Sequence, residues 1–291
     1  MVDHSRERVQ LIDRLDKQFR RAVRRLEQEF FEAVRDFYVS ELDIVDGHVK
    51  KGTAANYARV NKIENLSKKF AANEGRNIAK KIARGFHNLI QVNESYFGGV
   101  AFASAGLQKR VRKDLLRRYG IKEVKGGLDL VKGGWVLNLS KIDNPFQRVQ
   151  EMGVRAVAQG IPLGAFQKQI KDAAFDTGAR SIKHHYRTNA NDAYAQFDRT
   201  TQTTYADELG LRAFIYEGGL IETSREFCEE RNGKVFTTEE AEAWEFLDWK
   251  GKNKDYDPLR DMGGYNCRHH PSFISDQLAI ALRPELADLL K

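Results

Sequence analysis

An unbroken apolar stripe near the start of the chain limits the possible folds most. From residue 7 to residue 40, large apolar side chains recur at steps of three and four, with charged residues between them. Such steps keep side chains on one face of an α-helix, so the pattern predicts one long helix over residues 7–40. The stripe consists of Ile12, Leu15, Phe19, Val23, Leu26, Phe30, Val34 and Phe37. It must be covered, either by the helix's own domain or by neighbouring subunits that zip together around a ring.

The positive charge of the chain is concentrated in residues 51–125. The whole chain carries a net charge of +7, and this segment alone holds 17 Lys and Arg against 5 Asp and Glu. Helical periodicity over residues 53–92 and 100–119, with a break at Gly98 and Gly99, predicts two basic helices. Nine of their basic residues are candidate contacts to an anionic partner: Lys62, Lys68, Lys69, Lys80, Lys81, Arg84, Lys109, Arg110 and Lys113.

Three explanations fit these charges. Double-stranded nucleic acid would bind through its phosphates without its sequence being read, because clustered Lys and Arg release counterions from the phosphate backbone. An acidic protein surface would use the same charges, and a solvated face needs no partner. Aromatic side chains are sparse in these helices, which argues against a platform that stacks single-stranded bases.

The periodicity changes after residue 120. Residues 121–127 and 133–139 predict a hairpin of two short strands that also marks a domain boundary. Helices are predicted over residues 144–158, 165–175 and 181–209, and a strand over 211–216 is expected to pair with one over 235–237. Thr237 or Thr238 is expected to cap a short helix. Residues 272–291 predict a last amphipathic helix, kinked at Pro284.

Both cysteines of the chain lie between residues 222 and 273. Cys228 opens a turn that ends at Gly233, and Cys267 stands two residues before His269. Two thiolates and an imidazole on two loops suit zinc, which takes four tetrahedral sulfur or nitrogen ligands. We refer to Cys228, Cys267 and His269 as the Cys/His knuckle. The fourth ligand is left open among His270, Asp261, His184 and His185.

Other roles for these residues need no metal. Cys228 can be a small buried hydrophobe while the adjacent histidines form local hydrogen bonds. A Cys228–Cys267 disulfide suits an extracellular particle better than a reducing cytoplasm. In an enzyme, Cys228 and His269 would form a thiol–imidazole pair, with Glu222 or Glu226 orienting the ring. The sequence contains no nucleotide-binding P-loop, no G-x-S-x-G motif and no H-E-x-x-H motif.

These elements predict an α+β fold that is mainly α. A basic helical region over residues 1–120 and a hairpin or linker over 121–143 are expected to precede a domain over 144–291, with a small antiparallel sheet and the Cys/His knuckle. Two cysteines in 291 residues exclude a disulfide framework. The polar start lacks the pattern of a signal peptide, and no apolar run is long enough to cross a membrane, so we expect a cytoplasmic protein without a membrane partner.

The residues around the knuckle resemble the C-terminal signature of the phage head-morphogenesis family, the Mu F-like minor head proteins. That signature reads D-x-R-T-C-x-x-C-x-x-x-x-G-x-x-F, followed by H-P-x-C-R-C. Cys228, Gly233 and Phe236 match the first part, and Cys267 and Arg268 match the later Cys-Arg pair. Arg225 and His269 stand where the family has its first and last cysteines.

The resemblance extends upstream to residues 187–194, which are similar to the family's R-T-E-x-x-x-A-Y helix, and covers roughly residues 145–275. No comparable match is found in the first 120 residues. The exchange of cysteine for His269 keeps a metal ligand, whereas the exchange for Arg225 removes one.

This resemblance implies a minor head protein of a tailed phage or prophage, present in several copies. Such a protein associates with the portal and other head proteins, first in the host cytoplasm and then inside the virion head near packaged double-stranded DNA. It would act in head assembly or genome delivery without being an enzyme, with structural zinc as its one cofactor. The alternatives are a toxin-like enzyme or nuclease acting on nucleic acid, and a non-specific DNA-binding protein.

Overall fold

The computed structural model describes residues 2–139, 144–175 and 182–290, except that the side chains of 2–5, 67, 71, 144–148, 173–174 and 182–192 are not described. Helices and small antiparallel sheets build the chain, which confirms the predicted α+β, mainly α class. The elements are α1 (Val2–Glu41), β1 (Ile44–Val45), β2 (His48–Val49), α2 (Ala54–Val100), α3 (Ala105–Arg118), β3 (Ile121–Val124), β4 (Gly127–Leu130), α4 (Trp135–Leu139), α5 (Asn144–Gln159), α6 (Leu163–Ala174), α7 (Ile182–Leu209), β5 (Ala213–Glu217), α8 (Glu226–Arg231), β6 (Val235–Thr237), α9 (Thr238–Glu242), η1 (Ala243–Phe246), α10 (Pro258–Asp261), β7 (His270–Ile274), α11 (Asp276–Leu282) and η2 (Pro284–Asp288).

The chain forms two compact units, and each draws on separate stretches of sequence. One comprises Met1–Asp16, Ile82–Asp129 and Ala190–Lys291, and we call it the sheet unit; the other comprises Lys17–Lys81 and Leu130–Asn189, and we call it the helical unit. Helices α1, α2 and α7 contribute residues to both. The sequence predicted consecutive segments instead, and the separate roles assigned to those segments stay predictions.

The predicted apolar stripe of α1 is buried within the chain. Its residues from Ile12 to Val34 are at most 9% exposed, so the chain itself covers them. The stripe ends at Tyr38 rather than at the predicted Phe37, which is half-buried. A step of four residues is closer to the helical period of 3.6 than a step of three. The next buried position after Val34 is therefore Tyr38, four residues further on.

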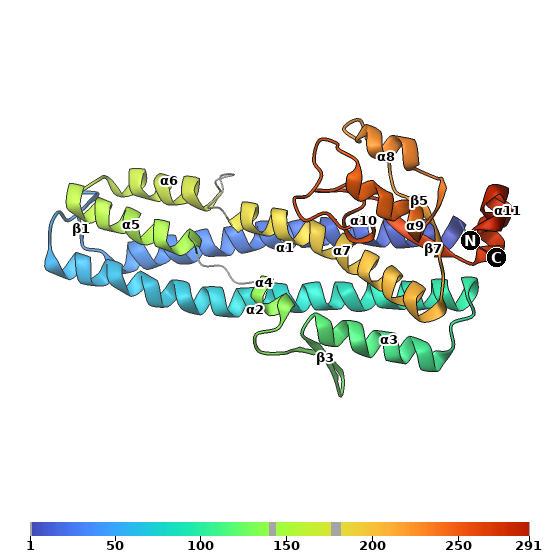
Figure 1. The fold of residues 1–291 in the computed structure, drawn as a ribbon. Coiled ribbons are helices and arrows are strands. Elements are labelled where there is room, and N and C mark those ends of the chain that lie inside the picture. Colours follow the sequence, from blue (N-terminus) through green and yellow to red (C-terminus); the bar gives the residue numbers. More distant parts are fainter. Residues whose placement is uncertain (1, 140–143, 176–181, 291) are drawn as a thin grey trace. The chain divides into compact units, whose positions relative to one another are not determined.

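In the helical unit, α5 and α6 lie along the parts of α1 and α2 that belong to the same unit (Figure 1). The hydroxyl of Tyr38 donates to the backbone oxygen of Val149 at 3.0 Å, and its ring lies 4.9 Å from that of Phe166. Gly153 of α5 lies against Tyr38, where an added Cβ would be 2.4 Å from the hydroxyl oxygen. Close approach at this glycine lets α5 pack directly on α1.

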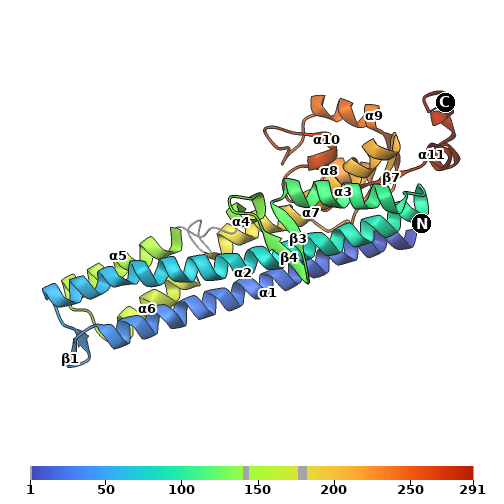
Figure 2. The same ribbon diagram turned by 90° about the horizontal axis from the view of Figure 1, so that it is seen from below.

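In the sheet unit, α3 lies beside the end of α2, next to the hairpin of β3 and β4 (Figure 2). Phe86 of α2 stacks on Phe197 of α7 with ring centroids 3.9 Å apart, and Tyr119 contacts both rings edge-on. The two phenylalanine rings are buried, and together with Tyr119 they fix α7 against α2.

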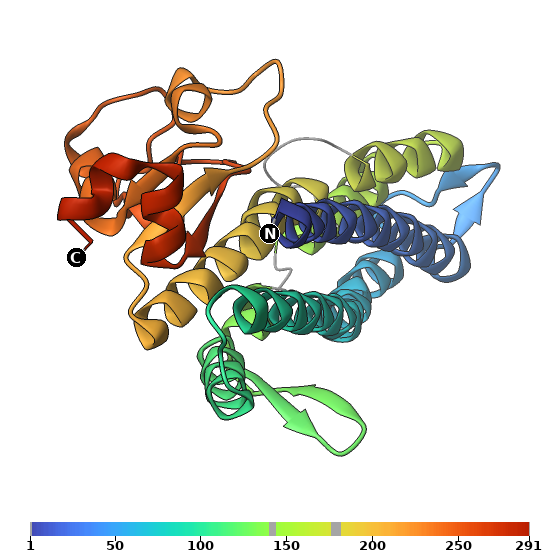
Figure 3. The same ribbon diagram turned by 90° about the vertical axis from the view of Figure 1, so that its right-hand side faces the viewer.

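The three-stranded sheet has the order β6-β5-β7, with both pairs antiparallel. The predicted pairing of the strand near 211–216 with residues 235–237 is confirmed, since Ala213 faces Thr237. Thr237 caps α9, and its side chain and that of Glu240 form a reciprocal capping box. Helix α11, η2 and the residues after it cover one part of this sheet through Ala279, Leu286 and Leu290 (Figure 3).

Three predictions are wrong. Residues 135–139 form the helix α4 rather than a strand, and β4 at Gly127–Leu130 completes the hairpin with β3. Residues 270–274 form β7, so the C-terminal helix begins only at Asp276, after the cap residue Ser275. Pairing with β5 along five residue pairs outweighs the helical periodicity that the sequence shows there. Gly98 and Gly99 do not interrupt α2, which continues to Val100.

A buried polar network joins α1, α2, α7 and β7 inside the sheet unit. The carboxylate of Asp198 lies 3.3 Å from Nε of Arg8 and 2.9 Å from Nδ1 of His270, and it accepts a hydrogen bond from Asn93. All four side chains are buried. Burial acts to raise the pKa of Asp198, but the positive charge of Arg8 and the hydrogen bonds from His270 and Asn93 lower it to about 2.

We expect Asp198→Asn to lower the free energy of unfolding by about 3 kcal/mol, because it leaves Arg8 buried without its counter-charge. The folded-state pKa of Asp198 is depressed, so its contribution is present above its ordinary value of 3.8 and is lost as the pH falls towards about 2. The difference in the free energy of unfolding between variant and wild type, measured with denaturant, should therefore become smaller as the pH falls through that range. Asp207→Asn, at an exposed position of the same helix, is the control. An equal effect of both substitutions would contradict this interpretation.

Candidate metal centre

The Cys/His knuckle assembles because two segments of the sheet unit meet beside β5. Cys228 lies in the short helix α8, and Cys267 and His269 lie in the loop that leads into β7. Their ligand atoms lie within 4.8 Å of one another, and all three side chains are buried. The sequence prediction that these two distant loops meet is therefore confirmed.

Arg199 of α7 holds the second loop in place. Its guanidinium group donates to four backbone oxygens, those of His269 at 3.0 Å, Arg260 at 2.9 Å, Asp261 at 3.5 Å and Cys267 at 2.7 Å. Arg199 is only 3% exposed, so these hydrogen bonds form away from water. The loop that carries two of the three ligands is thus fixed to the long helix of the unit.

Two distances within the knuckle match those around a tetrahedral zinc ion, and all three ligand atoms lie within 4.8 Å of one another. The sulfurs of Cys228 and Cys267 are 3.9 Å apart, and the Cys267 sulfur is 3.6 Å from Nδ1 of His269. Zinc–ligand bonds at tetrahedral angles place two sulfurs about 3.8 Å apart and a sulfur and a nitrogen about 3.6 Å apart. Nδ1 of His269 approaches the sulfur and is the nitrogen that would bind the ion, while the other ring nitrogen, Nε2, is buried without a hydrogen-bond partner among the described residues. The residues present therefore fit zinc.

Backbone amides and glycines complete the surroundings of the sulfurs. The amides of Gly263 and His269 donate to the Cys267 sulfur at 3.2 and 3.4 Å. A Cβ at Gly263 would lie 2.3 Å from the Cys228 sulfur, and one at Gly218 would lie 2.7 Å from the His269 ring. Both positions require glycine because the ligands approach the backbone so closely.

The two thiols differ in acidity. The hydrogen bond from Cys228 holds the pKa of the Cys267 thiol well below its ordinary value, and His269 and the charge of Arg199 act in the same direction. The hydrogen bond to Cys267 and burial raise the pKa of Cys228. Cys267 is thus the sulfur that carries negative charge first, and negative sulfur is the form that binds metal.

The fourth ligand is not among the predicted residues whose side chains are described. His270 faces away to Asp198, and the carboxylate of Asp261 accepts from the backbone amide of Asp257 at 2.8 Å and pairs with Arg260. His184 and His185 lie outside the described side chains. Arg225, at the position where the resembled signature has its first cysteine, donates to the backbone oxygens of Lys250 and Tyr265. It joins two loops by hydrogen bonds, and its guanidinium group has no free lone pair with which to bind a metal.

The structure does not supply the orienting carboxylate of the enzymatic interpretation. In the described part of the chain, no carboxylate hydrogen-bonds to His269, and Glu222 and Glu226 are exposed. A thiol–imidazole pair without such a group lacks the third member that usually orients the base.

The nine predicted basic contact residues are all exposed, and they belong to both units. Lys62, Lys68 and Arg110 form ion pairs with Glu41, Glu64 and Glu208. The other six have no ion-pair partner among the described residues: Lys69, Lys80, Lys81, Arg84, Lys109 and Lys113.

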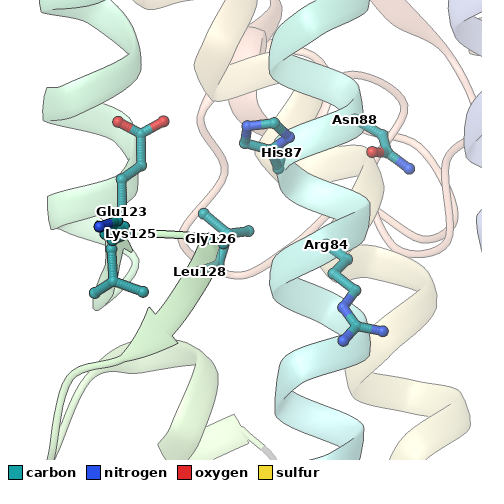
Figure 4. Close-up of a pocket in the computed structure, with 9 residues that line it drawn as sticks. Arg84, His87, Asn88, Glu123, Lys125, Gly126 and Leu128 are labelled. Atoms are coloured by element: carbon teal, nitrogen blue, oxygen red, sulfur yellow. The ribbon is translucent and has the colours of Figure 1, made fainter.

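Arg84 lines a pocket of about 520 Å³ between α2 and the β3–β4 hairpin. Figure 4 shows Arg84, His87 and Asn88 on one side of this pocket, with Glu123, Lys125 and Gly126 on the other. Its lining mixes charges of both signs, so it adds little to the basic surface itself.

Sequence reasoning missed three residues of the site, Arg199, Tyr216 and Gly263. Tyr216 of β5 places its hydroxyl 3.3 Å from the Cys228 sulfur and 3.9 Å from the Cys267 sulfur. Its pKa is raised well above the ordinary value, first by burial and then by the negative charge of Cys267. Of these three residues, only Gly263 has a signal in the sequence, because it is one of two consecutive glycines after Met262. Paired glycines often mark a place where the backbone passes close to other atoms.

Comparison with protein-family models, curated proteins and solved structures found no match to this chain. Within the described residues, no helix combines the length and the apolar character that crossing a membrane requires.

We expect Gly263→Ala to weaken zinc binding by about 10- to 100-fold, the range that follows loss of a supporting contact around a metal site. The added methyl group would displace the Cys228 sulfur. Zinc affinity is measured by competition with a chelator. Gly219→Ala is the matched control, because a Cβ there meets nothing within 4 Å. Equal affinities in both variants would show that the ion does not bind at the knuckle.

Proposed function

We propose that this chain is a minor head protein of a tailed phage or prophage, with a sheet unit fastened by a structural zinc ion. The observation that carries the proposal is the meeting of Cys228, Cys267 and His269. Cys228 and Cys267 lie 39 residues apart and belong to the two halves of a signature that resembles the Mu F-like family. If the likeness were accidental, nothing would require both halves to converge on one buried point.

Zinc would supply a cross-link between α8 and the loop before β7. Cys228 would hold it from α8, and Cys267 and His269 would hold it from the loop before β7. Structural zinc contributes directly to folding stability, because the unfolded chain has no preformed site. This role suits a protein that must remain folded inside a particle, and it requires no catalytic group.

The basic residues support double-stranded DNA or an acidic head protein as the partner. On α2 of the helical unit, Lys62, Lys69 and Lys80 are separated by 7 and 11 residues, which places them on one face of the helix. Lys69 and Lys80 are exposed and have no ion-pair partner among the described residues, so binding a phosphate would not first break an ion pair. We favour packaged DNA for this face and the portal for the protein as a whole.

Co-expression with the portal protein from the same genome tests the proposal. We expect the full-length chain to co-purify with portal rings through size-exclusion chromatography, and a variant with Lys69, Lys80 and Lys81 changed to Ala to remain bound. That variant should bind DNA with a shallower dependence on salt, because it contacts fewer phosphates.

Two results would count against a minor head protein. A folded chain that never associates with the portal, but binds DNA with a steep salt dependence, would be a plain DNA-binding protein. If the wild-type chain cleaves nucleic acid, and Cys228→Ser loses this activity but still assembles normally, the result would favour a nuclease or other enzyme that acts on nucleic acid.

A further inference from the structure

The hydroxyl of Tyr216 occupies a place in the knuckle that no part of the sequence pattern assigns. It extends from β5 towards both sulfurs, at 3.3 Å from Cys228 and 3.9 Å from Cys267. The side chain is fully buried, and its ring is held between those of His269 and Trp244, at 4.9 and 5.7 Å. The hydroxyl therefore has a fixed position beside the other three groups.

We propose that the oxygen of Tyr216 is the fourth ligand of a closed zinc site made of two cysteines, one histidine and one tyrosine. This inference rests on the proposed zinc-binding role of Cys228, Cys267 and His269. Zinc–oxygen and zinc–sulfur bonds at tetrahedral angles place oxygen and sulfur about 3.5 Å apart. The two oxygen–sulfur distances lie on either side of that value, so Tyr216 completes the tetrahedron with small shifts.

The space around the sulfurs supports this assignment. The absent Cβ of Gly263 would lie within 3.3 Å of the Tyr216 oxygen and closer still to both sulfurs. The Tyr216 oxygen and the two sulfurs thus surround one small volume, and the backbone at Gly263 forms one wall of it. Because His270 and Asp261 are engaged elsewhere, Tyr216 is the remaining described oxygen or nitrogen side chain that contacts both sulfurs.

A closed site has a consequence for function. Zinc with four protein ligands has no open position for water or substrate, whereas catalytic zinc keeps one. The Tyr216 ligand would therefore make the site structural, and the side chain would tie the central strand β5 to the same ion as α8 and the loop before β7. The phenolic proton is released to the buffer when zinc binds.

Titration of zinc into the metal-free full-length chain tests this ligand, with near-ultraviolet difference absorbance as the readout. For each zinc bound, we expect the absorbance of the tyrosinate band to rise by the amount that ionisation of one of the chain's 10 tyrosines gives. Tyr216→Phe should lose the band and bind zinc roughly 10-fold more weakly or worse. Tyr256→Phe is the matched control, because its hydroxyl donates to the backbone oxygen of Met262 and lies outside the ligand set. It should keep both the band and the affinity.

Zinc binding at full affinity without a tyrosinate band would overturn the assignment of Tyr216 while leaving the zinc site intact. Failure of the wild-type chain to bind zinc at all would overturn the zinc site itself, and with it this ligand. The wild-type titration decides between these outcomes even if Tyr216→Phe fails to fold, which circular dichroism checks.

Discussion

Arg199 connects the long helix α7 to the loop that carries Cys267 and His269. By donating to four backbone oxygens of residues 260–269, it sets the course of a loop that has little regular structure of its own. Its charge also favours the negative form of Cys267. A single buried side chain therefore holds the loop of the site in place. Its positive charge also balances part of the negative charge on the Cys267 sulfur, which a bound metal would neutralise.

Asp198 precedes Arg199 on α7 and contacts a different set of residues. It faces Arg8 and His270, so two consecutive residues of one helix attach the start of α1, the loop before β7 and the first residue of β7. Buried charges are costly unless they are paired, and here each one is matched by hydrogen bonds or an opposite charge. Hydrophobic packing alone would not specify which of the two adjacent histidines turns towards the sulfurs. Pairing of His270 with Asp198 leaves His269 for the knuckle.

The sequence predicted the large helices, the β5–β6 pairing and the Thr237 cap, because each depends on local periodicity or on turn residues. It failed at residues 135–139 and 270–274, where tertiary pairing or packing decides between helix and strand. The knuckle could be predicted from two cysteines and a histidine at a recognisable spacing. Arg199 and Tyr216 could not, because their roles depend on a helix and a strand that lie far from those ligands in the sequence.

Zinc K-edge X-ray absorption of the purified full-length chain tests the central claim most directly. Cys228 and Cys267 predict two sulfur neighbours at about 2.3 Å, with two nitrogen or oxygen neighbours at about 2.0 Å from His269 and Tyr216. A zinc ion surrounded only by nitrogen and oxygen would contradict the claim, since adventitious surface binding gives that environment. So would a shell with one sulfur, because the two halves of the signature would then not share an ion.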